Sequence, residues 1–225
     1  KLLADNDELI RERQPPLLRN SSGYYLRGVR NDDSLNMPRL LTGSEGTLGL
    51  MTEVKLHTSP LPEFRSVALL LFGKMEDAID SVQAITTQQP SACDLFDRRL
   101  LMLGRENDSR FANFIPPNAE AGLLIEQTGF SEQQARDRLS ATIAAASSIH
   151  PDVVIALEAW DPDGVEFLWE LPHRVVSLLA RMRGGTRPLP FVEDVAIPPE
   201  ALQEFFVRIQ QVLHKHDITA SLYSH

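Results

Sequence analysis

The sequence has few of the features that mark several common classes of protein. Its 225 residues include a single cysteine, Cys93, which excludes an internal disulfide and a cysteine-rich zinc or iron–sulfur site in these residues. No apolar run reaches the roughly 18 residues that a transmembrane helix needs. The charged start KLLADNDELIRER contains no signal-peptide core. We therefore expect a protein of a reducing compartment, the cytoplasm.

Positive charge is also scarce. The chain carries 22 Lys and Arg residues against 31 Asp and Glu residues, which gives a formal net charge of −9. Nucleic acids and anionic membranes are bound by basic surfaces, so we expect neither as a partner. An anionic ligand would have to meet a local cluster of cations.

The chain divides into two parts that differ in pattern. Residues 1–57 begin with a short helical pattern, which the prolines at 15 and 16 end, and continue as a long stretch rich in Asn, Ser, Asp and Gly. Residues 58–225 alternate regularly between strand and helix patterns. The chain lacks an initiator Met and stops at SLYSH within an expected strand. We therefore expect a fragment with a domain boundary near residue 57.

The second part is expected to be an α+β domain of the ferredoxin-like type. Strand patterns at 65–72, 91–96, 119–127 and 152–159 surround helix patterns at 74–89 and 131–148. This repeated strand–helix–strand order is typical of an antiparallel sheet with helices packed on one face. Further patterns predict helices at 165–182 and 198–216 and strands at 187–197 and 218–225.

The stretch TGSEGTLGLMTEV (42–54) concentrates three glycines just before an apolar segment. One interpretation is an ordinary turn in which glycine supplies a positive φ. The other is a surface of main-chain amides, free of side chains, that binds a phosphate. The spacing fits neither the P-loop, because no Lys-Ser/Thr pair follows, nor the dinucleotide fingerprint, which requires a following helix.

Several longer segments resemble one family. RNSSGYYLRG (19–28) and MPRLLTGSEGTLGLMTEVKLH (37–57) resemble the end of the flavin-binding domain in FAD-linked oxidases of the vanillyl-alcohol oxidase type. The likeness is strongest to the D-lactate, glycolate and D-2-hydroxyglutarate dehydrogenase branch. PFVEDVAIPPEAL (190–202) and SLYSH (221–225) resemble the C-terminal substrate domain of that group, particularly of large bacterial members fused to an iron–sulfur module.

The resemblance implies roles for both parts of the chain. Residues 1–57 would be the C-terminal piece of the FAD-binding domain, and residues 58–225 the substrate (cap) domain, truncated at its C-terminus. FAD would bind the parent protein and not these residues alone, and an iron–sulfur module would lie elsewhere in the parent. The residues implied at the cofactor are Gly43, Ser44, Glu45, Gly46, Thr47, Leu48, Gly49, Thr52 and Asn20.

The substrate residues follow from the same resemblance. His225 opens the family's histidine run, where it would serve as a catalytic base or as a ligand of a divalent metal. Family members commonly carry an arginine three residues after the tryptophan of LWELPHR (168–174), but this sequence has Pro172 there. Arg174 is therefore the candidate clamp for a substrate carboxylate, and a solvated surface arginine is the alternative. Glu193 would face the site, or would serve only in a structural ion pair.

The expected function is oxidation of a D-2-hydroxy acid by hydride transfer to FAD. The partners would be the small hydroxy acid and an unidentified electron acceptor, which could link an otherwise cytoplasmic protein to a membrane. Two alternatives remain open. One is a non-catalytic ferredoxin-like domain that binds a small acid or another protein, and the other is a flavin oxidase of the same superfamily that acts on an alcohol.

Overall fold

A computed structural model describes residues 1–14, 23–31, 34–181, 188–189 and 195–225. The chain forms two compact units, one that includes Lys1–Ser59 and one that comprises Pro60–Pro190 and Pro199–His225. The structure divides the chain close to the change of pattern at residue 57. The expected domain assignments themselves stay a prediction.

The first unit is built from short elements joined by turns. Its helices are α1 (Leu2–Asp5), α2 (Asp7–Arg13) and α3 (Met37–Leu41), and β1 (Arg30–Asn31) pairs antiparallel with β2 (Ser34–Leu35). The side-chain oxygen of Gln14 accepts hydrogen bonds from the amides of Leu26 and Arg27, at 2.8 and 3.0 Å. Asn36 caps α3 by accepting from the amide of Arg39. These contacts fix the path of the chain into the glycine-rich stretch that follows α3.

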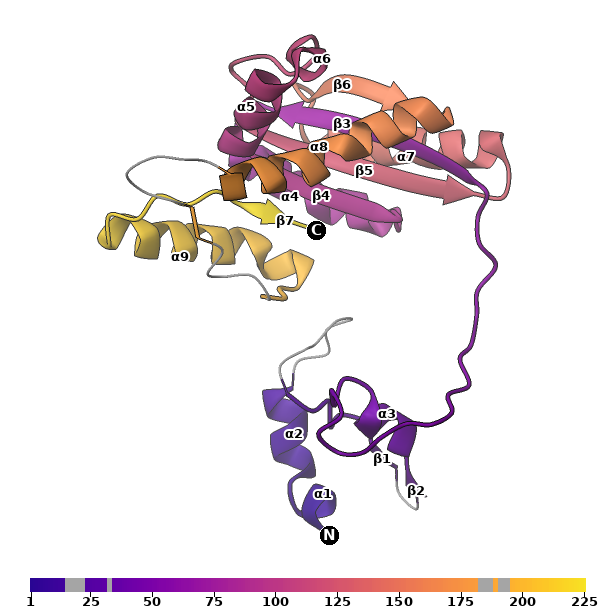
Figure 1. Cartoon of the computed structure of the whole chain (residues 1–225). Helices are drawn as coiled ribbons and strands as arrows, with labels where there is room; N and C mark the ends of the chain where they lie inside the picture. Colours follow the sequence, from indigo (N-terminus) through magenta and orange to yellow (C-terminus); the bar gives the residue numbers. More distant parts are fainter. Residues whose placement is uncertain (15–22, 32–33, 182–187, 190–194) are drawn as a thin grey trace. The chain divides into compact units, whose positions relative to one another are not determined.

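The second unit is an antiparallel sheet of five strands in the order β6-β3-β5-β4-β7 (Figure 1). The central strand β5 pairs with β3 along the whole length of β3. The last strand, β7, has two residues and pairs only with β4. The strands are β3 (Phe64–Phe72), β4 (Ala92–Asp97), β5 (Ala121–Gly129), β6 (Val154–Ala159) and β7 (Tyr223–Ser224).

Helices cover both faces of this sheet. Alternate side chains of a strand point to opposite faces, so Val67, Leu69 and Leu71 pack in one apolar cluster and Ala68 and Leu70 in the other. Figure 1 shows α8 across one face of the sheet, with α4 and α7 on the other. The first cluster contains residues of α5 (Arg98–Asn107), α6 (Ser109–Ala112) and α8 (Pro162–Arg181), and the second residues of α4 (Met75–Thr87), α7 (Glu132–Ile149) and α9 (Leu202–Lys215).

The α+β class and the antiparallel sheet are confirmed, but two details differ from expectation. We expected helices on one face of the sheet, where α4 and α7 do pack. The opposite face is also covered, because α5 and α8 bury the apolar side chains that point that way. The strand expected at 218–225 is limited to Tyr223–Ser224. The strand expected at 187–197 falls mainly outside the described residues, and residues 195–198 have no regular structure.

The close contact of β5 with the start of α7 gives a test of this packing. A Cβ added at Gly129 would lie 2.7 Å from the main-chain nitrogen of Ala135 and 3.0 Å from the carbonyl oxygen of Ser131. We expect Gly129→Ala to lower the free energy of unfolding by about 1–3 kcal/mol, because main-chain atoms must move. Gly73→Ala is the matched control, since nothing lies within 4 Å of its added Cβ. Equal urea midpoints for the two variants would contradict this packing.

Candidate functional site

The glycine-rich loop after α3 has an unusual main chain. Gly43 and Gly46 have φ of +77°, and Glu45 between them has φ of +50°. A Cβ added at Gly43 or Gly46 would meet nothing within 4 Å. Glycine is therefore required at these two positions by backbone conformation and not by lack of space. The positive φ values agree with the turn interpretation of the stretch.

Part of the expected amide surface is already used within the loop. The amide of Ser44 donates to the carbonyl of Leu41 at 3.1 Å, and the amide of Thr47 donates to the carbonyl of Ser44 at 2.9 Å. The hydroxyl of Thr47 also donates to the Ser44 carbonyl and lies 2.8 Å from the hydroxyl of Tyr24. The amides of Ser44 and Thr47 therefore form hydrogen bonds within the chain and are not open to a phosphate.

The remaining amides of the loop are candidate phosphate donors. Within the described residues, the main-chain N–H groups of Glu45, Gly46 and Leu48 donate to no other main-chain group. Gly49 has neither a positive φ nor any atom within 4 Å of an added Cβ, so the surrounding chain does not require glycine there. This loop therefore fits a ligand that approaches the main chain closely. Thr52 lies exposed beyond it, and Asn20 lies outside the described residues.

Arg174 lies in what we call the α6–α8 charge cluster, which consists of Asp108, Arg110, Glu170 and Arg174. Its guanidinium contacts Asp108 at 2.7 Å and Glu170 at 2.6 Å. Arg110 contacts the same two carboxylates, both at 2.7 Å. Hydrogen bonds from Arg110, aided by the charge of Arg174, lower the pKa of the Asp108 carboxyl to about 2. Arg174 thus links α8 to Asp108, the residue before α6, while its contact with Glu170 lies within α8.

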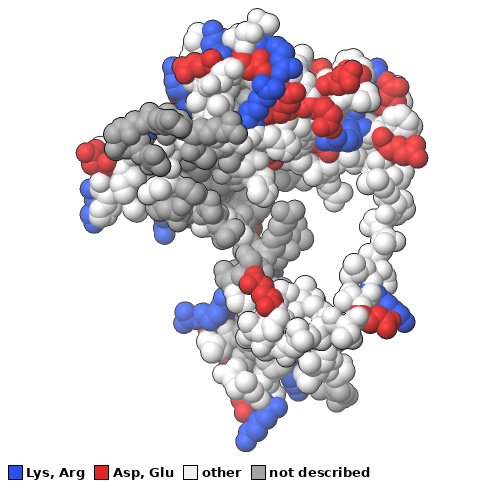
Figure 2. Space-filling model, in the orientation of Figure 1, with Lys and Arg blue, Asp and Glu red and all other residues white. Residues whose placement is uncertain are grey.

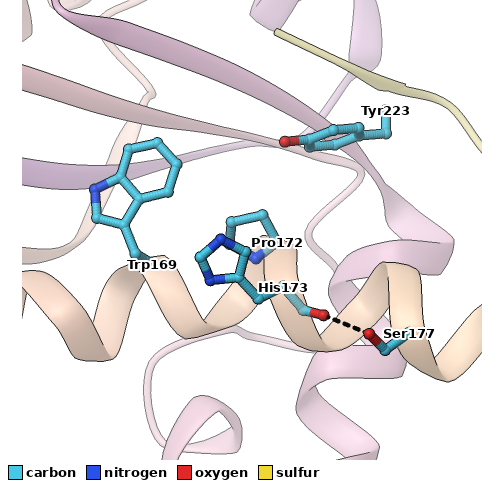
Figure 3. A pocket seen from close by; sticks show the side chains of 5 residues that line it. All are labelled: Trp169, Pro172, His173, Ser177 and Tyr223. Carbon is cyan, nitrogen blue, oxygen red and sulfur yellow. Dashed lines mark hydrogen bonds between the residues drawn. The ribbon is translucent and has the colours of Figure 1, made fainter.

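A second place of interest is an open hollow of about 440 Å³ between α8 and β7. Trp169, His173 and Ser177 line it from successive turns of α8, since residues four apart share a face of a helix. Pro172 and Tyr223 complete its walls, and these five residues define what we call the α8–β7 hollow. Figure 3 shows the imidazole of His173 beside Pro172, between the indole and the phenol.

Most polar hydrogens around the α8–β7 hollow are committed to the protein. Trp169 Nε1 donates to Glu126 Oε2 at 2.9 Å, and Ser177 Oγ donates to the carbonyl of His173 at 2.9 Å. The hydroxyl of Tyr223 donates to Asp94 Oδ2 at 2.5 Å. His173 differs from these three residues, because its ring nitrogens have no hydrogen-bond partner among the described residues.

Two buried carboxylates, Asp94 and Glu126, lie behind the α8–β7 hollow. Asp94 is 4% exposed and Glu126 8%. Arg65 neutralises Glu126 through contacts of 2.8 and 2.7 Å to Oε2. Burial raises the pKa of Asp94, although the hydrogen bond from Tyr223 and the charges of His225 and His173 act in the opposite direction. Burial and the contact with Asp94 raise the pKa of Tyr223, so its phenol keeps its proton.

β7 brings His225 to the same region. The main chain of β7 pairs with Leu95 and Phe96 of β4. Just before β7, the amide of Leu222 donates to Asp97 Oδ2 at 2.8 Å. The same carboxyl group caps α5 through Oδ1. The ring of His225 lies 6.1 Å from that of Tyr223. The structure therefore places His225 next to the α8–β7 hollow, whereas Arg174 does not line it.

Other features of the described residues bear on ligands and partners. No group of three or more His, Cys, Asp or Glu side chains suited to a metal gathers in these ranges. Of the helices in the described part of the chain, none combines the length and apolar character needed to cross a bilayer. Figure 2 shows acidic and basic side chains interspersed on the visible face of the second unit, with no uniform basic patch in that view. Glu193 lies outside the described residues.

Three comparisons with known proteins found similar families, sequences and structures. Residues 61–225 match the family described as "FAD linked oxidases, C-terminal domain". D-2-hydroxyglutarate dehydrogenase of Pantoea ananatis is 30% identical over 98% of this chain and 23% of its own length. Glycolate oxidase subunit GlcD of Bacillus subtilis is 28% identical over 84% of this chain and 39% of its own. A solved alkyldihydroxyacetonephosphate synthase covers 62% of this chain and 29% of its own, with a TM-score of 0.47 and 17% identity.

The lowered pKa of Asp108 predicts how acid affects the second unit. The ordinary carboxyl pKa is 3.8, and that of the folded chain is about 2. The stability contributed by the α6–α8 charge cluster is therefore complete above pH 4 and is lost as the pH falls toward 2. We expect Asp108→Asn to flatten the fall of the melting temperature over this range. Asp152→Asn, at an exposed residue before β6, is the control, and an unchanged slope in the Asp108 variant would refute the assignment.

Proposed function

The chain belongs to the family of FAD-linked oxidases, C-terminal domain, and from that membership we propose that it serves an FAD-dependent dehydrogenase of D-2-hydroxy acids. The family match over residues 61–225 carries the proposal. Two relatives support the substrate class, because their names specify D-2-hydroxyglutarate and glycolate, which are both 2-hydroxy acids. The chain spans 23% of the first of these relatives, so the active protein would include further regions.

The proposed reaction converts a 2-hydroxy acid into a 2-oxo acid. The C–H bond at carbon 2 breaks with both electrons going to the acceptor, and the hydroxyl group loses its proton as the C=O bond forms. FAD, when bound, supplies the two-electron acceptor. We assign the proton to His225, either as a base or as a ligand of a divalent metal that acidifies the hydroxyl. Its position beside the α8–β7 hollow supports this role.

The glycine-rich loop is proposed to contact the diphosphate of FAD. The unpaired amides of Glu45, Gly46 and Leu48 would donate to phosphate oxygens. Ser44 and Thr47 would act indirectly, because their amides and the Thr47 hydroxyl hold the loop in shape. Gly43 supplies a positive φ, and Gly49 would leave room for the cofactor. Asn20 and Thr52 remain weaker candidates near the same cofactor.

The contacts of Arg174 bear on whether it can bind the substrate carboxylate. Arg174 was expected to bind it, but both of its carboxylate partners belong to the chain. Binding a substrate there would break contacts of the α6–α8 charge cluster. Glu193 stays a proposal for the site, as do an unidentified electron acceptor and a cytoplasmic location. Because Arg174 already pairs with Asp108 and Glu170, the structure also favours the second candidate function, a flavin oxidase that acts on an alcohol. Such an enzyme needs no arginine to bind a substrate carboxylate.

Spectroscopy of the full-length protein separates these functions. We expect a flavin absorbance band that is bleached anaerobically by D-lactate, glycolate or D-2-hydroxyglutarate. Bleaching by primary or aryl alcohols and not by hydroxy acids would instead establish the alcohol oxidase. A protein that purifies without flavin, and takes up none when FAD is added, would overturn both and leave a binding domain.

Gly49 allows the cofactor role of the loop to be tested apart from folding. The chain around Gly49 does not require glycine, so Gly49→Val should leave the thermal unfolding of the 225-residue chain unchanged. In the full-length protein the same variant should bind FAD at least about tenfold more weakly, because the side chain blocks a phosphate hydrogen bond. Flavin content is measured by absorbance after dialysis. Wild-type retention of FAD would show that the loop faces away from the cofactor.

A further inference from the structure

We infer that His173, and not Arg174, binds the carboxylate of the substrate, inside the α8–β7 hollow. This inference rests on the proposed function and adds to it a residue that the sequence pattern does not indicate. The chemical class of the ligand is a small organic acid that carries a 2-hydroxyl group. The imidazole would donate a single charge-assisted hydrogen bond to one carboxylate oxygen.

The hydrogen bonds around the hollow single out His173. The polar hydrogens of Trp169, Ser177 and Tyr223 are bound by Glu126, the His173 carbonyl and Asp94. A carboxylate only accepts hydrogen bonds, so it needs a donor that is not already engaged. Within the described lining of the hollow, the ring of His173 is that donor. His173 lines the hollow together with Trp169 and Tyr223, and its imidazole lies beside Pro172 (Figure 3).

Several charged groups surround His173, and most of them are paired within the chain. Asp94 on β4 and Glu126 on β5 lie behind the hollow, His225 and Tyr223 approach from β7, and Glu170 and Arg174 are neighbours on α8. Glu126 is neutralised by Arg65, and Glu170 by Arg110 and Arg174. Asp94 has a phenol as its hydrogen-bond partner and no cation within ion-pair distance in the described residues. The charges of His225 and His173 act to lower the pKa of Asp94, against the effect of burial.

The shape of the hollow suits a small acid. Its volume of about 440 Å³ lies within the usual range for small-molecule sites. The indole, the proline ring and the phenol provide apolar walls of an open hollow in which His173 is exposed. Pro172, which also lines the hollow, has a side chain without charge or hydrogen-bond donor, so it does not compete with His173 for a carboxylate.

Steady-state kinetics of the full-length protein test the inference. We expect His173→Gln to raise KM for the D-2-hydroxy acid by about tenfold to a hundredfold, because one charge-assisted hydrogen bond is lost. The value of kcat should change less than about threefold, since the imidazole does not touch the reacting carbon. His173→Arg should recover most of the loss in KM. His214→Gln, the same substitution at an exposed position of α9, should match the wild type.

A binding measurement separates failure of this inference from failure of the proposed function. In the 225-residue chain, D-lactate should shift the NMR signals of the His173 imidazole in a saturable way and leave those of His214 unchanged. Turnover with an unchanged KM in His173→Gln would overturn the inference and keep the proposed function. A saturable shift at His173, together with a full-length protein that shows no turnover, would keep the assignment of His173 as the binding residue and overturn the proposed function. D-lactate that moves no His173 signal would overturn the inference even if the His173 variants fail to fold.

Discussion

The hydrogen bond from the Tyr223 phenol to the buried carboxylate of Asp94 holds together the region on which the candidate site depends. β7 has two residues, and main-chain pairing with β4 alone gives it little stability. Asp94 and Asp97, three residues apart on β4, each accept a hydrogen bond from the segment that contains β7. Without these bonds the last strand would fray, and Tyr223 would no longer form a wall of the α8–β7 hollow.

These bonds require carboxylates to be buried, which is costly unless the charge is compensated. Glu126 is compensated by Arg65 and by the indole of Trp169. Among the side chains of the described residues, Asp94 receives a hydrogen bond from the phenol alone, and burial raises its pKa. The face of the sheet that meets α8 therefore combines a well-packed apolar region with a polar edge whose charges are incompletely balanced. Incomplete balance of this kind is common where a protein binds a charged ligand.

The sequence alone predicted most of the regular structure because its periodicity is strong. It also contained the signal for helices on both faces. Val67 to Phe72 is continuously apolar, and an uninterrupted apolar run is typical of a strand buried on both sides. The expectation of helices on one face followed the order of the elements and neglected this run. The need for glycine at Gly43 and Gly46 could likewise be predicted, because few other residues adopt a positive φ.

The site was harder to predict because its contacts join residues far apart in the sequence. Arg174 pairs with Asp108, which lies 66 residues earlier, and Tyr223 pairs with Asp94, 129 residues earlier. No local pattern reveals that one arginine is engaged or that one phenol is fixed. Trp169, His173 and Ser177 are spaced at intervals of four, which puts them on one face of a helix, but this spacing alone does not indicate a site. Only the folded chain shows that this face borders a hollow.

Pro172 gives the clearest reason to place function at this hollow. Proline within a helix removes a main-chain hydrogen bond and costs about 3 kcal/mol. It lies inside α8, where Leu168, Leu171 and Val175 on either side are fully buried and hold the helix in place. Packing thus maintains a residue that local propensity disfavours. Residues that contradict local secondary-structure propensity are usually found at functional sites. Pro172 is such a residue, and it lines the α8–β7 hollow together with His173.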